Sequence, residues 1–382
     1  MNIHTVQFSH ILEASDLESL RYFLSHTAFV ISHKSEPVEN LLNVLWYLPA
    51  NSPVIIVSNC PESEWEYLSL TLENRLTHHQ KIYLVHQKDA SIARLFQRCG
   101  VYQILGEDGK VVNGKGEGMY IGTLCAYLLG YVRWVVFYDA DNFVPSALLE
   151  YTMAMSKLFT ATPLPSSCSE CDTIIVRDTI QELPALHNVR VCWSSKPQLN
   201  GKDMQTKVMG RCTSVVSPIC NDLLEGWFGM RDHTLRTSNA GEQGLTMEAA
   251  STLRFSSGYS VETFQLLDLF YHAINGQGSA RGIVLQQYLS KSPHFHEKRG
   301  DEHIKKMIEQ SLGSFFHFES ALPANVRRSL EQAYDQFQLE LIYPTLYPAL
   351  RDLPLEQERI LMKRFALFAD EDDPEYLACA LL

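Results

Sequence analysis

Long apolar runs are missing from this chain of 382 residues. No stretch of about 18 apolar residues occurs, so the sequence predicts no membrane-spanning helix. Residues 1–7 have neither the basic start nor the apolar core of a secretory signal. We therefore expect a cytoplasmic protein that has no membrane partner.

An excess of positive charge is also missing. The chain has 32 Lys and Arg residues against 44 Asp and Glu residues, which gives a formal net charge of −12. Nucleic-acid-binding domains carry basic patches or stripes, so we expect no nucleic-acid partner. A phosphorylated substrate would need a local basic pocket formed by a few Arg and Lys side chains.

The nine cysteines follow no spacing pattern apart from the pair Cys168 and Cys171. A zinc site would need a second pair or histidines at a fitting spacing, and a redox pair would open a helix after a strand. Neither context surrounds Cys168. Because the chain also lacks an export signal, we interpret the cysteines as reduced thiols.

The first half of the chain alternates β-branched apolar runs with helical patterns, and 46% of all residues are hydrophobic. This alternation predicts an α/β domain with a largely parallel sheet. The apolar runs predict strands at 29–32, 53–59 and 81–86, and the helical patterns lie at 38–45 and 91–96.

Polar residues follow each of the predicted strands. In open α/β sheets, ligands bind outside the carboxyl ends of the strands. Residues far apart in the sequence can therefore converge on one crevice, and those expected to do so are Lys34, Glu36, Asn59, Gln87 and Asp139.

The second half changes from strands to helices. A loop rich in Pro, Ser and Cys at 162–168 precedes strand-like residues 173–177 and 189–193, which we expect to extend the same sheet. From about residue 303 the pattern is helical, with an amphipathic segment at 326–342. We predict a substrate-binding domain at 1–302, an all-helical C-terminal extension at 303–382 and a solvated acidic tail at 370–373.

The apolar run 134–138 ends in two carboxylates, Asp139 and Asp141. Two acids so close together repel each other unless a cation lies between them, and Mg²⁺ or Mn²⁺ holding a nucleotide diphosphate suits such oxygen ligands. This Asp-x-Asp pattern is typical of nucleotide-sugar glycosyltransferases. A solvated turn with two acids explains the pair equally well, so the neighbouring segments have to decide.

A glycine-rich loop at 113–118 contains Lys115 and precedes a helical pattern at 119–129. Glycines that allow close approach, a lysine and the free amides of a helix N-terminus together favour an anion such as phosphate. The Gly-Lys-Ser/Thr ending of a Walker loop is missing, which argues against ATP hydrolysis of that type. A flexible turn is the alternative interpretation.

Two histidines, His294 and His296, lie on one side of the chain if their segment is extended. Imidazole and carboxylate together form a reasonable ligand set for Mn²⁺ or a similar ion. A surface loop with two ordinary histidines is the alternative.

Further candidate contacts follow glycines. Gly210, Arg211 and Thr213 offer a guanidinium and a hydroxyl group, which suit a carboxylate or phosphate. Glu242 and Glu262 each follow a glycine turn and can bind sugar hydroxyls, or they are helix-cap or surface acids.

Taken in order, these segments resemble the mannosyl-3-phosphoglycerate synthases, which are retaining glycosyltransferases with the GT-A fold. The resemblance spans roughly residues 28 to 312, and a set of motifs in one order is more specific than any single motif. The glucosyl-3-phosphoglycerate synthases share several of the motifs. The matching segments are 33–37, 85–89, 114–118, 139–142, 258–262, 293–297 and 300–304.

The resemblance implies a reaction and a fold. Mannose would pass from GDP-mannose to the 2-hydroxyl of 3-phospho-D-glycerate, with retention of configuration and release of GDP, as a step towards the compatible solute mannosylglycerate. The fold would be a GT-A-type mixed sheet flanked by helices, and the cofactor would be Mg²⁺, Mn²⁺ or Co²⁺. A glucosyl-3-phosphoglycerate synthase that uses GDP- or UDP-glucose is the alternative.

The resemblance also implies roles for individual residues. Asp141 and His294 would bind the metal, with His296 as the alternative to His294, and Asp139, Asp141 and Lys115 would be the catalytic set. The donor would contact Lys34, Glu36, Gln87, Lys115, Asp139 and Glu262. The acceptor would contact Gly210, Arg211, Thr213 and His296.

The mechanism implied is a front-face route in which the leaving phosphate accepts the acceptor proton, because no nucleophile can be assigned. Lys115 and the metal would stabilise the charge on departing GDP. Two roles are open for the C-terminal helices: they form a homodimer interface or they cover the acceptor site.

Two other classes of protein are weighed against this interpretation. A sugar-1-phosphate nucleotidyltransferase would carry a glycine-rich loop on its first strand, and residues 29–34 have none. A binding protein without catalysis would be expected to lack part of the set Asp139, Asp141 and His294, and all three residues are present.

Overall fold

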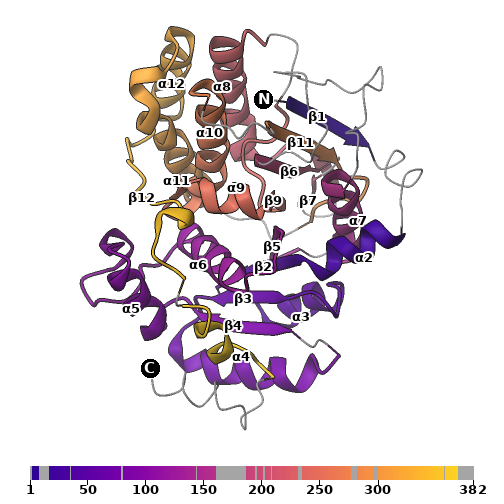
Figure 1. The fold of residues 1–382 in the computed structure, drawn as a ribbon. Coiled ribbons are helices and arrows are strands. Elements are labelled where there is room, and N and C mark those ends of the chain that lie inside the picture. The colour runs from indigo at the N-terminus through magenta and orange to yellow at the C-terminus, as the bar shows by residue number, and fades with distance from the viewer. Residues whose placement is uncertain are drawn as a thin grey trace.

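An eight-stranded mixed sheet forms the centre of the fold (Figure 1). The computed structural model describes residues 2–7, 17–34, 36–78, 81–142, 144–160, 186–193, 196–200, 203–207, 209–230, 235–276, 282–295, 300–356 and 358–368. The strand order is β1-β11-β6-β9-β5-β2-β3-β4. The strands are β1 (Asn2–Gln7), β2 (Thr27–His33), β3 (Val54–Ser58), β4 (Ile82–His86), β5 (Trp134–Asp139), β6 (Leu186–Cys192), β9 (Gln243–Thr246) and β11 (Ile283–Leu289).

Strand β9 is antiparallel to both of its neighbours, β5 and β6. The other neighbouring strands pair in parallel. A parallel sheet that is covered on both faces reads as nearly continuous apolar runs, and β3, with the sequence Val-Ile-Ile-Val-Ser, is buried at every position. The predicted α/β class, a mixed sheet flanked by helices, is confirmed.

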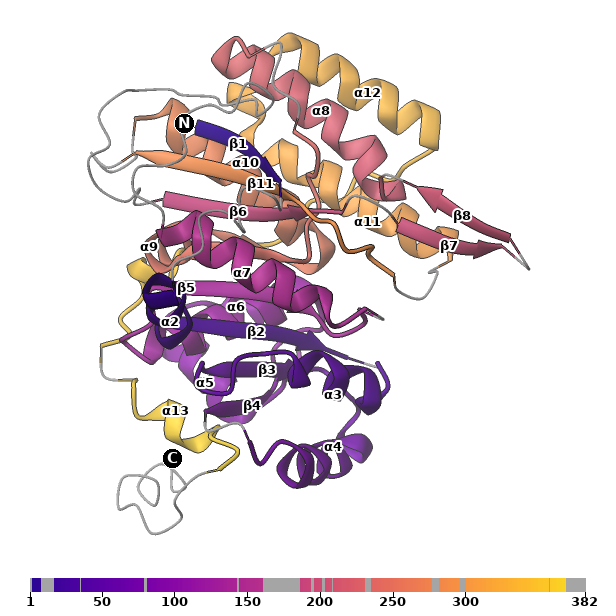
Figure 2. The ribbon, with the colours of Figure 1, turned by 90° about the vertical axis from the view of Figure 1, so that its right-hand side faces the viewer.

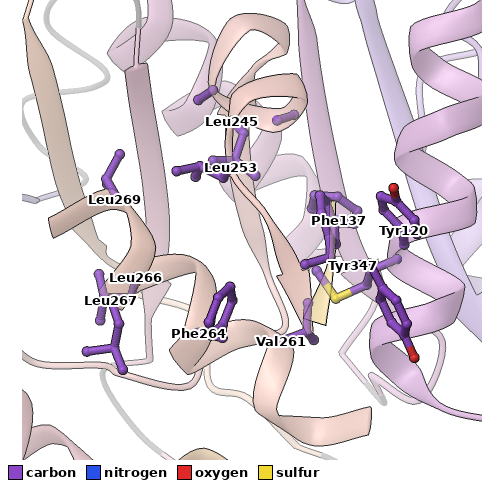
Figure 3. Close-up of a cluster of buried hydrophobic side chains, with 14 of the residues drawn as sticks. Tyr120, Phe137, Leu245, Leu253, Val261, Phe264, Leu266, Leu267, Leu269 and Tyr347 are labelled. Carbon is purple, nitrogen blue, oxygen red and sulfur yellow. The ribbon is translucent and has the colours of Figure 1, made fainter. Parts of the chain in front are cut away.

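Helices cover the sheet on both faces, and each face has its own cluster of buried side chains. The larger cluster includes Leu124, Phe264 and Leu312, and Figure 3 shows part of it. Its helices are α5 (Ala90–Arg98), α6 (Lys115–Leu128), α8 (Arg211–Phe228), α9 (Met247–Thr252), α10 (Val261–Ile274), α11 (Asp301–Gly313) and α12 (Ala324–Phe337). The helices of the second cluster are α2 (Leu17–Ser25), α3 (Val38–Trp46), α4 (Glu62–Arg75) and α7 (Ala147–Thr160).

Smaller elements complete the fold. A β-hairpin projects from the body of the molecule (Figure 2), and a second short antiparallel pair links the middle of the chain to its C-terminal part. The strands of these pairs are β7 (Lys196–Asn200), β8 (Asp203–Lys207), β10 (Phe255–Ser256) and β12 (Leu346–Tyr347). The short helices are η1 (Tyr102–Ile104), η2 (Gly258–Ser260), η3 (Ser314–Ala321), η4 (Leu350–Asp352) and α13 (Leu361–Arg364).

The elements predicted in the first half are confirmed as β2, α3, β3, β4 and α5, and the run at 189–193 is confirmed as the end of β6. Strands β1, β9 and β11 were not predicted. The strand-like run at 173–177, the Cys168–Cys171 pair and the acidic run at 370–373 lie outside the described residues. Of the helices that the structure describes, none is long and apolar enough to cross a membrane.

The predicted helical C-terminal extension is confirmed by α11 and α12, but the extension is not helical throughout. Helix α12 ends at Phe337, and Gln338 has a left-handed backbone with φ of 49°. Beyond it, Pro344 and Pro348 cannot donate helical hydrogen bonds. The chain forms β12 and then runs back to β4, where the Leu84 amide donates to the Phe365 carbonyl (Figure 1).

The division between residues 302 and 303 stays a prediction. Helix α11 spans this point, since it begins at Asp301. Its Ile308 and Leu312 belong to the same buried cluster as Val216 of α8 and Phe264 of α10. This packing against α8 and α10 places residues of α11 in the lining of the cleft at the carboxyl ends of the strands.

Candidate active site

A cleft of about 500 Å³ lies at the carboxyl ends of β2, β3 and β5. Helices α8 and α11 supply further walls. His296 lies outside the described residues. Apart from Glu242, the other candidate residues line this one cleft: Lys34, Glu36, Gln87, Lys115, Asp139, Asp141, Gly210, Arg211, Thr213, Glu262 and His294, together with Asn59.

The segment around Lys115 is the first turn of α6, not a loop before it. The predicted helix start at residue 119 was therefore wrong. Gly116 lets α6 pack closely, because a Cβ there would lie 2.0 Å from the Ser256 carbonyl oxygen. The glycine-rich sequence thus serves helix packing as well as the cleft.

Lys115 joins the ends of two elements by ion pairs. Its Nζ lies 2.7 Å from Asp139 Oδ1 at the end of β5 and 2.7 Å from Glu262 Oε1 in the first turn of α10. Burial lowers the pKa of Lys115, but the charges and hydrogen bonds of the two carboxylates outweigh this effect and hold the pKa well above its ordinary value. Lys115 is therefore a fixed cation at the cleft.

Asp139 packs directly against the backbone of Gly241. A Cβ at Gly241 would lie 2.1 Å from Asp139 Oδ2, so only glycine leaves room for this carboxylate. The next residue, Glu242, is fully buried, and neither of its side-chain oxygens has a hydrogen-bond partner among the residues that the structure describes. The interpretation of Glu242 as a surface acid is wrong, and its side chain is not among those lining the cleft.

Burial raises the pKa of Glu242 well above its ordinary value, and the nearby charge of Asp139 raises it further, while Lys115 acts in the opposite direction. The imidazole of His294 is also close to Glu242, since its Nδ1 lies 3.7 Å from Glu242 Oε1. The His294 ring is only 2% exposed. It stacks on Trp193 with ring centroids 3.8 Å apart and planes 11° apart, so the surface-loop interpretation is wrong for this histidine.

A second buried cation lies behind Glu262. Arg190 of β6 is fully buried, and its Nη2 donates to the carbonyl oxygens of Glu262 and Ser238 at 2.9 and 3.2 Å. Burial lowers the pKa of Arg190 to about 10, and the charge of Glu262 opposes this effect. Sequence reasoning did not single out Arg190, because a buried arginine in a strand carries no local signal.

The charges at the cleft fit a divalent cation. Four carboxyl groups, those of Asp139, Asp141, Glu242 and Glu262, are clustered with the cations Lys115 and Arg190. Buried carboxylates without partners are costly, and oxygen and imidazole ligands suit Mg²⁺ or Mn²⁺. Within the described ranges, no three acidic, His or Cys side chains are already arranged as a metal site.

The end of the cleft that contains Lys34, Glu36 and Gln87 is shaped by hydrogen bonds among its lining residues. The Lys34 amide donates to Glu36 Oε2 at 2.8 Å. Gln87 donates from Nε2 to the carbonyl oxygens of Val112 and Gly114, at 2.7 and 3.3 Å. Gln87 therefore also holds the segment that leads into α6. This structural role of Gln87 was not predicted from the sequence.

The opposite end of the cleft is formed by the N-terminus of α8, an 18-residue helix that begins at Arg211 with Gly210 as its N-cap. Free amides and the helix dipole at such an end favour an anion. Arg211 Nη1 lies 2.5 Å from Asp301 Oδ1 at the start of α11. This places the Gly-Arg-x-Thr motif beside the C-terminal helices.

Helix α11 contributes to the cleft through residues to which sequence reasoning gave no role. Gln310 Oε1 accepts a 2.7 Å hydrogen bond from the Tyr259 amide, and the His303 ring lies 5.0 Å from the Tyr259 ring, centroid to centroid. In the sequence, only the motif at 300–304 indicated that this helix contributes to the site. The α11 residues lining the cleft are His303, Ile304, Lys306, Met307 and Gln310.

Comparisons with known proteins agree with this arrangement. A sequence model of the family described as mannosyl-3-phosphoglycerate synthase matches residues 3–360. The curated mannosyl-3-phosphoglycerate synthase of Pyrococcus furiosus is 33% identical over 321 residues, which cover 80% of this chain and 75% of the relative. That of Aeropyrum pernix is 31% identical over 317 residues, which cover 80% and 76%.

A solved structure shows the same fold. The crystal structure of mannosyl-3-phosphoglycerate synthase from Rubrobacter xylanophilus is 14% identical, with a TM-score of 0.50, and the match covers 84% of this chain and 83% of that chain. The likeness agrees with the predicted GT-A-type sheet. The family match extends over most of the sequence, and the motifs that carry the resemblance meet in one cleft. The chain belongs to the mannosyl-3-phosphoglycerate synthase family.

Proposed function

We propose that the protein transfers mannose from GDP-mannose to the 2-hydroxyl of 3-phospho-D-glycerate with retention of configuration and releases GDP. The observation that carries this proposal is the meeting of the Asp139–Asp141 end of β5 with the N-terminus of α8 in one cleft. The first supplies a site for a nucleotide diphosphate and the second a site for a phosphorylated acid. The curated relatives carry the corresponding name.

We further propose Asp141 and His294 as metal ligands, with His296 as the alternative to His294. Both described residues line the cleft, and the surplus of carboxyl groups favours a bound divalent cation. Mg²⁺, Mn²⁺ or Co²⁺ would neutralise charge on the diphosphate as the glycosidic bond breaks. Asp139 would contact the donor or its metal.

Lys115 is the fixed cation of the proposed mechanism. It is held by Asp139 and Glu262 at 2.7 Å each, so its ammonium group needs little reorganisation when charge develops on the leaving phosphate. Glu262 would in addition hold sugar hydroxyls. Lys34, Glu36 and Gln87 would line the nucleotide region.

The proposed chemical step takes place on one face of the sugar. The bond between mannose C1 and the β-phosphate oxygen breaks, and C1 bonds to the 2-oxygen of phosphoglycerate on the same face. The hydroxyl proton passes to the departing phosphate, so no separate base or nucleophile is required. Gly210, Arg211 and Thr213 would orient the acceptor, with the helix end binding its phosphate.

The proposal is tested by measuring GDP release from GDP-mannose and Mg²⁺, with and without 3-phosphoglycerate. Parallel reactions use GDP-glucose and UDP-glucose, and the anomeric configuration of the product is read by NMR. We expect strong acceptor-dependent release from GDP-mannose and an α-linked product. Preference for a glucose donor would instead indicate a glucosyl-3-phosphoglycerate synthase. The proposal would be contradicted if 3-phosphoglycerate failed to increase nucleotide release from every donor tested. We also propose that the reaction takes place in the cytoplasm.

A further inference from the structure

Glu242 is a buried carboxyl group that the proposed reaction does not use. Its side chain is fully buried, and within the described part of the chain neither oxygen has a hydrogen-bond partner. Such a group is costly to bury without a compensating contact. Lys115 does not provide it, because its ammonium group is already held by Asp139 and Glu262.

The backbone of Glu242 is fixed on both sides. The Val191 amide of β6 donates to the Glu242 carbonyl at 3.0 Å. The next residue, Gln243, begins β9 and pairs with Phe137 of β5 and Arg190 of β6. The preceding Gly241 is in close contact with the Asp139 carboxylate. The chain therefore holds the Glu242 side chain at one place beneath the ends of β5 and β6.

The polar group that Glu242 faces is the imidazole of His294. Nδ1 of this ring is buried and lies 3.7 Å from Glu242 Oε1, so a shift of less than about 1 Å would form a hydrogen bond. The stacked Trp193 ring sets the plane of the imidazole. His294 at the same time lines the cleft. With Nδ1 turned towards Glu242, the metal-ligand role proposed for His294 falls to Nε2, the other ring nitrogen.

We propose that Glu242 is a positioning residue for the metal site: it accepts a hydrogen bond from Nδ1–H of His294 and thereby presents the unprotonated Nε2 to the metal. Carboxylates commonly orient metal-binding imidazoles in this way, and they fix the tautomer as well as the ring orientation. The inference rests on the proposed function, because it assumes that His294 binds the metal. Glu242 itself is not among the residues that line the cleft.

The test measures Mn²⁺ affinity of the full-length protein by the electron paramagnetic resonance signal of free Mn²⁺. Glu242→Met removes the acceptor at similar side-chain size, and Glu242→Gln keeps one acceptor oxygen. We expect the Met variant to bind Mn²⁺ about 10- to 100-fold more weakly and the Gln variant to recover part of the loss. The visible absorption of bound Co²⁺ should also change in the Met variant as the imidazole ligand is lost or reoriented.

Glu309→Met is the matched control. Glu309 is another buried carboxyl group, it accepts from the Glu340 amide at 2.8 Å, and it is not among the residues lining the cleft. This variant should keep wild-type Mn²⁺ affinity. A cooperative unfolding transition, measured on each variant without metal, shows that the variant is folded. If Glu242→Met does not fold, the same comparison is made with Glu242→Gln and wild type.

The outcomes separate this inference from the proposed function. Wild-type Mn²⁺ affinity in the folded Glu242 variants, combined with weak binding by His294→Ala, would overturn the inference and leave the metal assignment intact. Unchanged affinity in His294→Ala would overturn both the inference and the assignment of His294. Acceptor-dependent GDP release by the wild-type protein tests the proposed transfer independently of all these variants.

Discussion

The Tyr347 hydroxyl donates a 2.6 Å hydrogen bond to Glu117 Oε1, although 230 residues separate them in the sequence. The other carboxylate oxygen of Glu117 accepts from the Gly258 amide at 3.1 Å. Glu117 thus joins the first turn of α6, the turn before α10 and strand β12. Lys115 lies in the first turn of α6, and Glu262 lies in the first turn of α10, directly after the turn that contains Gly258. The C-terminal part of the chain therefore helps to fix the geometry of the cleft.

Removal of this hydroxyl in Tyr347→Phe should lower the free energy of unfolding by about 1–3 kcal/mol, because a buried carboxyl group loses a donor. The Tyr347 ring would keep its stacking on Tyr120, which Figure 3 shows beside it. Urea denaturation of the two proteins measures the difference. Tyr343→Phe is the control: Tyr343 is 60% exposed, and its variant should stay within about 0.5 kcal/mol of wild type. Equal effects of the two substitutions would contradict the assigned role of Tyr347.

Stability should also depend on pH through Glu117. Burial raises the pKa of Glu117 above its ordinary value of 4.5, although the hydrogen bonds from Tyr347 and Gly258 partly oppose this. A group with a raised folded-state pKa contributes its full stability below the unfolded pKa and loses it as pH rises through the folded value. The free energy of unfolding of wild type relative to Glu117→Gln should therefore fall as pH rises above 4.5. A difference that stays constant or increases across this range would show that the pKa is not raised.

The cleft could be predicted from the sequence because part of its lining depends on short-range patterns. Lys34, Asn59, Gln87 and Asp139 each follow an apolar run, and the rule that parallel strands end at one edge brings them together. Each of these strands is predicted by an apolar run of a few consecutive residues. The common edge of the parallel strands then predicts that the residues after these runs lie close together.

The features that escaped prediction depend on contacts between distant segments. Strand β11 contains the buried residues Gln286 and Gln287, which form hydrogen bonds with His187 and the Arg236 amide, respectively. Because of these two polar residues, the sequence pattern does not indicate an apolar strand. The burial of Glu242 likewise follows from packing by β5, β6 and His294. No local pattern distinguishes it from a surface glutamate.

Loss of the Lys115 ammonium group should impair catalysis, and it should also destabilise the fold because Asp139 and Glu262 lose their shared cation. In Lys115→Met, charge on the leaving phosphate loses its fixed cation, and we expect kcat to fall about 10²- to 10³-fold. Lys110→Met is the control, since Lys110 forms an exposed surface pair with Glu62 and such pairs contribute little. Steady-state kinetics with saturating GDP-mannose provide the measurement. A Lys115 variant with nearly wild-type kcat would remove this residue from the mechanism.

The acceptor assignment predicts a selective effect on one substrate. Arg211→Met should raise KM for 3-phosphoglycerate about 10- to 100-fold, the loss expected for a charge-assisted hydrogen bond, and leave KM for GDP-mannose almost unchanged. Arg328, which is exposed on α12, is the control position for the same substitution. A parallel increase in both KM values would indicate damage to the whole cleft and contradict a specific acceptor contact.

The proposed metal ligand Asp141 allows the most direct test of cofactor use. Asp141→Ala removes a carboxylate from a cleft that also contains Asp139 and His294, and we expect turnover that depends on Mg²⁺ to be lost together with tight Mn²⁺ binding. The measurements are initial rates against Mg²⁺ concentration and Mn²⁺ titration of the same protein. Asp352→Ala is the control, because Asp352 lies at the exposed η4 turn, away from the cleft lining. Activity of Asp141→Ala near that of wild type would exclude Asp141 as a metal ligand, since no remaining carboxylate should replace it without a loss of affinity.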